Sequence, residues 1–230
     1  MGKNGAPWAL FGEGVVALIR HRGRAVADIP KGMHRMPGPI VVLAERFVDS
    51  PAGPFVCLSI GEPVRAGSQV GLYFGISVIN SGEARQAGED HWGFPHELGS
   101  LHWSSDASSR TVVWKERNLE LRCAIKGRPL PLLFPMSSLQ SHGDSPVVTP
   151  RRNRSLVRRA RVEIVTEEGD PLESLAGIHR GFTLSGPAMH RRAVTQQANG
   201  WLTPLRGVLR APEPGVAGMR SHTASVRHGL

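Results

Sequence analysis

A histidine and a glutamate stand side by side in the segment Gly93-Phe94-Pro95-His96-Glu97-Leu98. Both side chains are capable of proton-transfer chemistry, and the imidazole is also capable of donating a hydrogen bond to a carbonyl. An imidazole titrates near neutral pH, so His96 would act as a general acid, a general base or a hydrogen-bond donor to a carbonyl. Glu97 would hold the imidazole, although adjacent side chains of a strand point to opposite faces. We therefore expect His96 and Glu97 to be the catalytic residues.

The longer stretch around these two residues resembles the signature of the acetoacetate decarboxylase-like superfamily. It reads Gly-Glu-Asp-His-Trp-Gly-Phe-Pro-His-Glu-Leu over 88–98, and the family pattern is close to Gly-Arg-Glu-x-Trp-Gly-x-Pro-Lys-Glu-Leu. The family lysine forms a Schiff base with a β-keto acid, and the resemblance places His96 at its position. An imidazole cannot condense with a ketone to give the iminium that accepts the electrons. The resemblance therefore implies a divergent member whose Schiff-base lysine is replaced by His96.

Further segments carry the same resemblance in the same order. Ala6-Pro7-Trp8-Ala9-Leu10-Phe11-Gly12 is similar to the opening of short bacterial members, and Asp49-Ser50-Pro51-Ala52-Gly53-Pro54-Phe55 to a family turn. Val147-Val148-Thr149-Pro150-Arg151 resembles a later arginine-rich strand. By register, Cys57 occupies the position of a family carboxylate that faces the active site. The resemblance covers about residues 6–185 and departs from the family where the chemistry should be.

The resemblance implies a fold and a substrate cavity. We expect an α+β, β-rich protein: an antiparallel barrel or double sheet that encloses a small-molecule cavity, with few short helices. The expected substrate-binding residues are Phe55, Cys57, Tyr73, Trp92 and Phe94, and two more aromatic residues are candidates for the cavity wall, Phe74 and Trp103. Cys57 and Cys123 have no disulfide or zinc spacing, and the histidines form no ligand motif, so no metal and no cofactor are expected.

Short apolar runs bounded by Gly, Pro, Asn and Asp favour strands throughout the chain. The predicted strands are 14–20, 40–48, 55–64, 70–79, 100–104, 111–114, 119–126, 130–134, 147–149, 155–165 and 181–184. Short helices are predicted to begin near Pro95 and within Pro171–Ala176. Composition suggests one domain over 1–186, a C-terminal extension of undecided role over 187–211, and a disordered tail over 212–230.

The formal net charge of +9 comes from arginine, and its densest block is Arg151–Arg161. This block lacks the stacking aromatic residues of nucleic-acid-binding modules, so we expect no nucleic-acid partner. No apolar run approaches the roughly 20 residues that cross a bilayer, and no signal peptide is evident, so no membrane partner and a cytoplasmic location are expected. The expected partner is a small-molecule substrate. Because members of the family commonly form oligomers, a homo-oligomer is an open expectation.

These observations favour an enzyme that works without a Schiff base on a hydrophobic, carbonyl-bearing, polyketide-like metabolite. A cavity that holds a flexible chain in its reactive conformer and hydrogen-bonds a carbonyl would catalyse cyclisation, including cycloaddition, or a related isomerisation or dehydration. Two alternatives stay open. One is a decarboxylase with a displaced lysine, for which Lys115 and Lys126 are candidates, and the other is a non-catalytic small-molecule-binding paralogue.

Overall fold

The computed structural model describes residues 6–20, 26–142, 145–191, 193–196 and 202–204 of the 230-residue chain. Strands dominate it, as the apolar runs predict. They are β1 (Trp8–Ile19), β2 (His34–Arg35), β3 (Ile40–Asp49), β4 (Phe55–Ala66), β5 (Gln69–Ile79), β6 (His96–Leu98), β7 (Leu101–Ser105), β8 (Ser109–Trp114), β9 (Leu119–His142), β10 (Ser145–Val165), β11 (Gly177–His190), β12 (Val194–Gln196) and β13 (Leu202–Pro204). One α-helix, α1 (Gly82–Trp92), and two short 3-10 helices, Lys115–Arg117 and Glu173–Leu175, complete the described elements.

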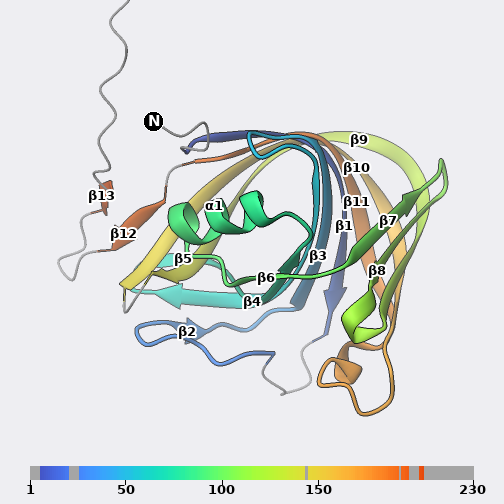
Figure 1. The fold of residues 1–230 in the computed structure, drawn as a ribbon, viewed down its shortest axis with the longest axis horizontal. Coiled ribbons are helices and arrows are strands. Elements are labelled where there is room, and N and C mark those ends of the chain that lie inside the picture. Colours follow the sequence, from blue (N-terminus) through green and yellow to red (C-terminus); the bar gives the residue numbers. More distant parts are fainter. Residues whose placement is uncertain (1–5, 21–25, 143–144, 192, 197–201, 205–230) are drawn as a thin grey trace, which may run out of the picture.

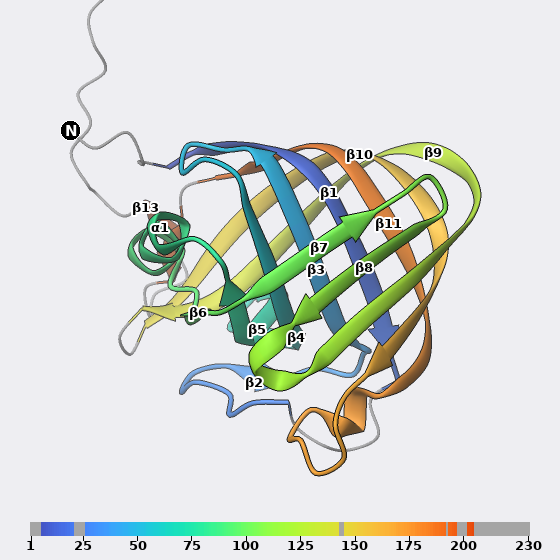
Figure 2. The same ribbon diagram turned by 45° about the vertical axis from the view of Figure 1, so that its right-hand side comes forward.

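The strands form one sheet that closes on itself (Figures 1 and 2). Antiparallel pairing runs from β9 through β10, β11, β1, β3 and β4 to β5. A parallel pair, Leu72 of β5 opposite Ser138 of β9, completes a ring of seven strands. The β-rich barrel expected from the sequence is therefore confirmed. It is a mixed sheet, because β6 also pairs in parallel with β5.

The two faces of this sheet bury separate hydrophobic cores. Outside the ring, the hairpin of β7 and β8 crosses the sheet in Figure 2 and packs Leu101, Val112 and Trp114 onto the central strands. Inside the ring, Trp8, Phe74 and other aromatic and aliphatic side chains form the second core, which also includes residues of α1. Strands buried on both faces read as continuous apolar runs, which explains why the sequence predicts them well.

The long strands β9 and β10 were each predicted as two shorter strands. The sequence breaks at Gly127, Pro129 and Pro131 in one and at Pro150 in the other, yet the two strands remain paired along their length apart from a bulge between Val157 and Arg159. The breaks accommodate a bend instead of ending the strands, as bulges do in strongly curved sheets. The first part of β9 pairs with β8, and the later part lines the inside of the ring.

Helix α1 is a correction to the sequence prediction, which placed a helix start near Pro95. Ser81 caps the helix by accepting a hydrogen bond from the backbone N–H of Ala84 at 3.3 Å. The helix ends at Gly93, whose φ of 66° lies in the left-handed region that favours glycine. Pro95 therefore follows the helix, and the next residues form β6 instead. The helix predicted within Pro171–Ala176 is confirmed as the 3-10 turn Glu173–Leu175.

The chain beyond residue 186 contributes to the same sheet. The expected domain boundary falls inside β11, which continues to His190, and β12 pairs with β10. The expected tail over 212–230 lies outside the described residues. No helix in the described ranges is long and apolar enough to span a membrane.

Candidate active site

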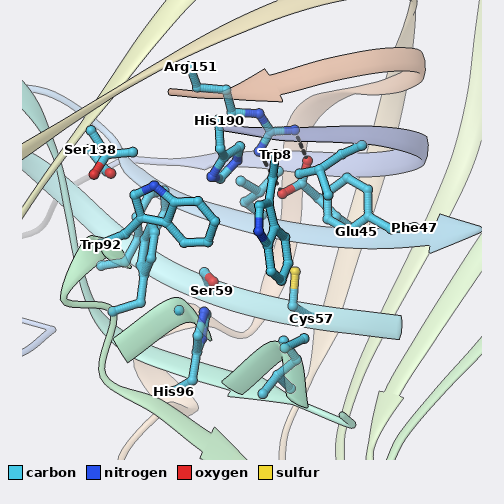
Figure 3. A pocket seen from close by; sticks show the side chains of 18 of the residues that line it. Trp8, Glu45, Phe47, Cys57, Ser59, Trp92, His96, Ser138, Arg151 and His190 are labelled. Carbon is cyan, nitrogen blue, oxygen red and sulfur yellow. Dashed lines mark hydrogen bonds and ion pairs between the residues drawn. The ribbon is translucent and has the colours of Figure 1, made fainter. Parts of the chain in front are cut away.

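A cavity of about 60 Å³ lies inside the ring, between α1 and the inner face of the sheet. Its walls are mostly apolar, with Trp8, Phe55, Phe74, Trp92 and Phe94 among them. Figure 3 shows the polar groups that project into this apolar enclosure from several strands: two imidazoles, an arginine with its glutamate, a thiol and two hydroxyls. A small number of converging polar groups in an apolar pocket is the usual form of a small-molecule site.

His96 reaches the cavity from β6, where the parallel pairing with β5 sets Ser77 opposite it. Its Nδ1 lies 2.7 Å from the Ser77 hydroxyl oxygen, which lies 2.7 Å from the hydroxyl oxygen of Ser59. The imidazole stacks on Phe94, with ring centroids 5.2 Å apart. Burial, with a smaller contribution from the nearby Arg85 cation, lowers the pKa of His96 to about 4. The imidazole is therefore neutral at physiological pH and has one N–H to donate.

Gly88 of α1 makes room for this imidazole. A Cβ built at Gly88 would lie 2.3 Å from Cδ2 and 2.7 Å from Nε2 of His96, closer than real side chains approach. Glycine inside a helix costs about 1 kcal/mol relative to alanine. The helix therefore gives up intrinsic stability at the position that lies over the ring of His96.

A second histidine, His190, enters the same cavity from the end of β11. In the sheet it stands opposite Trp8 of β1 and Arg151 of β10. Its Nε2 is buried and has no hydrogen-bond partner among the described residues. Burial, and then the neighbouring Arg151 and His96, lower the pKa of His190 well below its ordinary value. The cavity thus contains two neutral imidazoles, and one of them has an unused nitrogen.

A buried ion pair lies on the side of the cavity next to His190 (Figure 3). Nη1 of Arg151 donates to Oε2 of Glu45 at 2.8 Å, and Nη2 of Arg151 donates to Oε1. The two residues are 106 positions apart in the chain, and both are buried. Arg151 Nε and the hydroxyl of Thr149 have no partner in the described part of the chain. Together with His190, these groups favour a ligand that presents an oxygen acceptor.

Cys57 lies on β4 directly opposite Glu45 of β3, and its thiol is buried in the cavity wall. Burial, reinforced by the negative charge of Glu45, raises the pKa of Cys57 far above the ordinary value for a thiol. The thiol is therefore protonated and a poor nucleophile. A carboxylate does face this cavity, but Glu45 of the neighbouring strand supplies it instead of position 57.

Most of the residues that the sequence singled out meet in this cavity, and three do not. Phe55, Cys57, Phe74, Trp92, Phe94 and His96 line it. Glu97 is exposed, because successive side chains of β6 point to opposite faces, so it is not beside the His96 imidazole. Tyr73 packs in a separate core with Met33 and Val64. Trp103 donates a hydrogen bond to Glu13 at 3.1 Å and packs against the outer core.

Sequence reasoning missed Glu45, Arg151 and His190 as site residues. A usable signal existed for Glu45, which directly follows the apolar run Ile40–Ala44 of β3. Arg151 stands among other arginines of β10, such as Arg152 and Arg154, so no local pattern singled it out. No comparable signal marked His190, which follows the exposed Met189 near the end of β11. In the described ranges, no group of three His, Cys, Asp or Glu side chains lies close enough together to hold a metal ion.

Comparison with solved structures supports the same fold. An acetoacetate decarboxylase from Legionella pneumophila matches with a TM-score of 0.66 and 13% identity, over 84% of this chain and 88% of that chain. An acetoacetate decarboxylase-like enzyme from Sphingomonas wittichii matches with a TM-score of 0.62 and 12% identity, over 84% and 93%. The enduracididine biosynthesis enzyme MppR, complexed with pyruvate, matches with a TM-score of 0.58 and 14% identity, over 83% and 90%.

Sequence comparison alone does not detect these similarities: no protein-family model matches the chain, and no curated protein is significantly similar to it. The structural matches extend over most of each chain. The chain therefore has the acetoacetate decarboxylase-like fold, and the resemblance inferred from its motifs is confirmed at the level of the fold.

Proposed function

We propose that this protein is an enzyme that acts on a carbonyl-bearing metabolite without forming a Schiff base. The observation that carries the proposal is the cavity itself: His96 lines it, and no lysine among the described residues does. The buried donors polarise the substrate carbonyl, and the aromatic walls hold the rest of the reacting segment in one conformer. The reaction that suits this arrangement best is cyclisation of a hydrophobic, polyketide-like chain, including cycloaddition, or a related isomerisation or dehydration.

The lowered pKa of His96 favours a donor over a base. A group with a pKa of about 4 is a weak proton acceptor at neutral pH, whereas a neutral imidazole still donates through its N–H. When the Ser77 hydroxyl donates to Nδ1, the proton of the ring is on Nε2, at the edge that faces Gly88, which also lines the cavity. A preorganised donor in a water-poor site contributes about 3–4 kcal/mol to stabilising a developing oxyanion. His190, with its unused Nε2, is the second donor.

The placement of the lysines argues against the first alternative, a decarboxylase with a displaced lysine. Lys31, Lys115 and Lys126 are exposed, and none lines the cavity. Lys3 lies outside the described residues. A lysine nucleophile needs burial or a neighbouring cation to lower its pKa, and a solvated side chain lacks that environment. The second alternative, a binding protein without catalysis, uses the same cavity and is separated from the enzyme by experiment.

The test is turnover of carbonyl-bearing intermediates from the protein's own genomic neighbourhood, followed by mass spectrometry, with three proteins: wild type, His96→Ala and His102→Ala. His102 is exposed on β7 and serves as the matched control. We expect an isomeric or dehydrated product, slowed about 100- to 1,000-fold in His96→Ala and unchanged in His102→Ala.

Other outcomes overturn the proposal in distinguishable ways. Loss of carbon dioxide together with borohydride trapping of Lys115 or Lys126 establishes the displaced-lysine decarboxylase. Tight binding of a metabolite without turnover establishes the binding protein. Equal turnover by wild type and His96→Ala removes His96 from the chemistry.

A further inference from the structure

A second and much larger hollow lies along β9, next to the cavity. It is a groove of about 670 Å³, within the range of pockets that hold drug-sized ligands. Its apolar lining includes Leu130, Leu132 and Phe134 of β9, Val157 of β10 and Phe182 of β11. Leu130 and Leu132 are 61% and 48% exposed, so the groove presents large apolar side chains to solvent.

Most of the groove's lining on β9 and β10 shares one face of the hairpin with the cavity, while Leu133, which alternates to the other face, also borders the groove. Alternate residues of a strand point to the same side, so Leu132 and Phe134, in the groove, are followed on the same face by Met136 and Ser138, which line the cavity. The pairing with β10 supports the same orientation, because Arg151, which lines the cavity, stands directly across from Met136. From Leu132 to Ser138 this face extends about 20 Å at roughly 3.4 Å per residue.

The cavity and the groove differ in size, so they would hold different parts of one ligand. A site needs about 10–15 Å³ to hold one water, so the 60 Å³ cavity holds a group of only a few atoms. That is enough for the carbonyl group and the atoms next to it that react, but too little for the whole length of a polyketide-like chain. Phe134, Met136, Val157 and Phe182 are only partly buried, and they pack between the groove and the inner core.

Cations surround the outer end of the groove. Lys126, Arg128 and Arg159 are exposed and line it, and no acidic residue of the described ranges is among its lining. Lys126 and Arg159 stand directly opposite each other across the β9–β10 ladder, beside the bulge. Like charges at directly opposed positions of a sheet are destabilising, and a bound anion would offset that repulsion.

We propose that the groove binds the apolar chain of the substrate, a long-chain acyl compound with an acidic group at its distal end. The chain lies over Leu130, Leu132 and Phe134, the acidic group contacts the cationic rim, and the carbonyl end occupies the cavity beside His96. This inference rests on the proposed function only for the position of the carbonyl end. The binding of an apolar chain with a terminal anion is independent of catalysis.

The test measures binding of dodecanoate by calorimetry, with butanoate as the short-chain comparison. Leu132→Glu places a negative charge in the groove, and Leu156→Glu is its matched control, because Leu156 is 49% exposed on the opposite face of the same hairpin. We expect wild type and Leu156→Glu to bind dodecanoate and not butanoate, and Leu132→Glu to bind it at least tenfold more weakly. Arg159→Ala should weaken binding severalfold and reduce its salt dependence, whereas Arg161→Ala should not.

Failure of this inference is separable from failure of the proposed function. Binding of dodecanoate by His96→Ala at wild-type strength is expected, because the probe occupies the groove whatever His96 does. Absence of dodecanoate binding to the wild type overturns the proposal, as does equal weakening by Leu132→Glu and Leu156→Glu. If Leu132→Glu instead changes the oligomeric state in light scattering and leaves binding intact, the groove is a contact between copies of the chain, and the proposal is overturned.

Discussion

The contact between Gly88 and the imidazole of His96 is the tightest constraint on the site at the scale of single residues. A methyl group at position 88 would overlap the ring, so the helix and the histidine fit only as a pair. Two positions eight apart in the sequence are thus packed against each other in the cavity wall. The Gly at position 88 belongs to the same motif that identified His96, and the packing gives it a physical reason.

This pairing predicts opposite effects of one substitution in two backgrounds. Gly88→Ala in the wild type should lower the free energy of unfolding by about 1–3 kcal/mol, because overpacking displaces the imidazole. In a His96→Ala background the same change should be neutral or should stabilise by up to about 1 kcal/mol, because alanine favours the helix. Urea unfolding of the four proteins gives the coupling. Additive effects would show that the ring and the helix do not compete for space.

At the scale of elements, the cap residues at its two ends determine α1 more than any hydrophobic stripe along its length does. The buried residues Ala84, Ala87, Gly88 and Trp92 recur at helical spacing, but three of them are small, so the stripe carries little hydrophobic signal. This is why the sequence indicated the strands well and missed the helix. The strands are indicated in the sequence by their Val and Ile residues. The position of the helix is set by its cap residues, Ser81 and Gly93, and by the space above the cavity.

The C-terminal end of α1 gives a prediction at this scale. Gly93→Ala should destabilise the protein by at least about 1–2 kcal/mol, the cost of a left-handed conformation for a residue with a Cβ. The added Cβ would also lie 2.7 Å from the carbonyl oxygen of Ser141. Gly82→Ala at the other end is the control, because its Cβ would meet nothing within 4 Å. Thermal unfolding of both variants is the measurement, and a Gly82→Ala loss as large as that of Gly93→Ala would contradict the explanation.

At the scale of the whole molecule, the closed ring brings together residues that no local pattern connects. Glu45 meets Arg151 across 106 positions only because the strands between them curve back on themselves. Motifs in the sequence therefore indicated the fold and six cavity residues, while the pairing of Glu45 with Arg151 and the place of His190 became evident only in three dimensions. Tyr73 and Trp103 were misplaced for the same reason: an aromatic residue in a strand predicts burial but does not say on which side of the ring.

Acid should destabilise the molecule through its buried imidazoles. The pKa of His96 is about 4 in the folded state and 6.5 ordinarily, so between these values the unfolded chain binds a proton that the folded chain does not. Stability is therefore retained above about pH 6.5 and falls as the pH drops toward 4, by on the order of 3 kcal/mol from His96. His190 acts in the same direction. Urea unfolding across this range should show a shallower decline for His96→Gln than for wild type or His102→Gln; equal slopes would exclude the effect.

The pair of Glu45 and Arg151 also has an evolutionary consequence. Removing one partner of a buried pair costs about 3–5 kcal/mol, a large part of the 5–15 kcal/mol by which proteins of this kind are stable. A single substitution at either position therefore gives a protein with little remaining stability. Simultaneous replacement of both residues by apolar ones costs little free energy of unfolding. Descendants of this chain should keep both residues or lose both, so positions 45 and 151 should covary as one inherited unit.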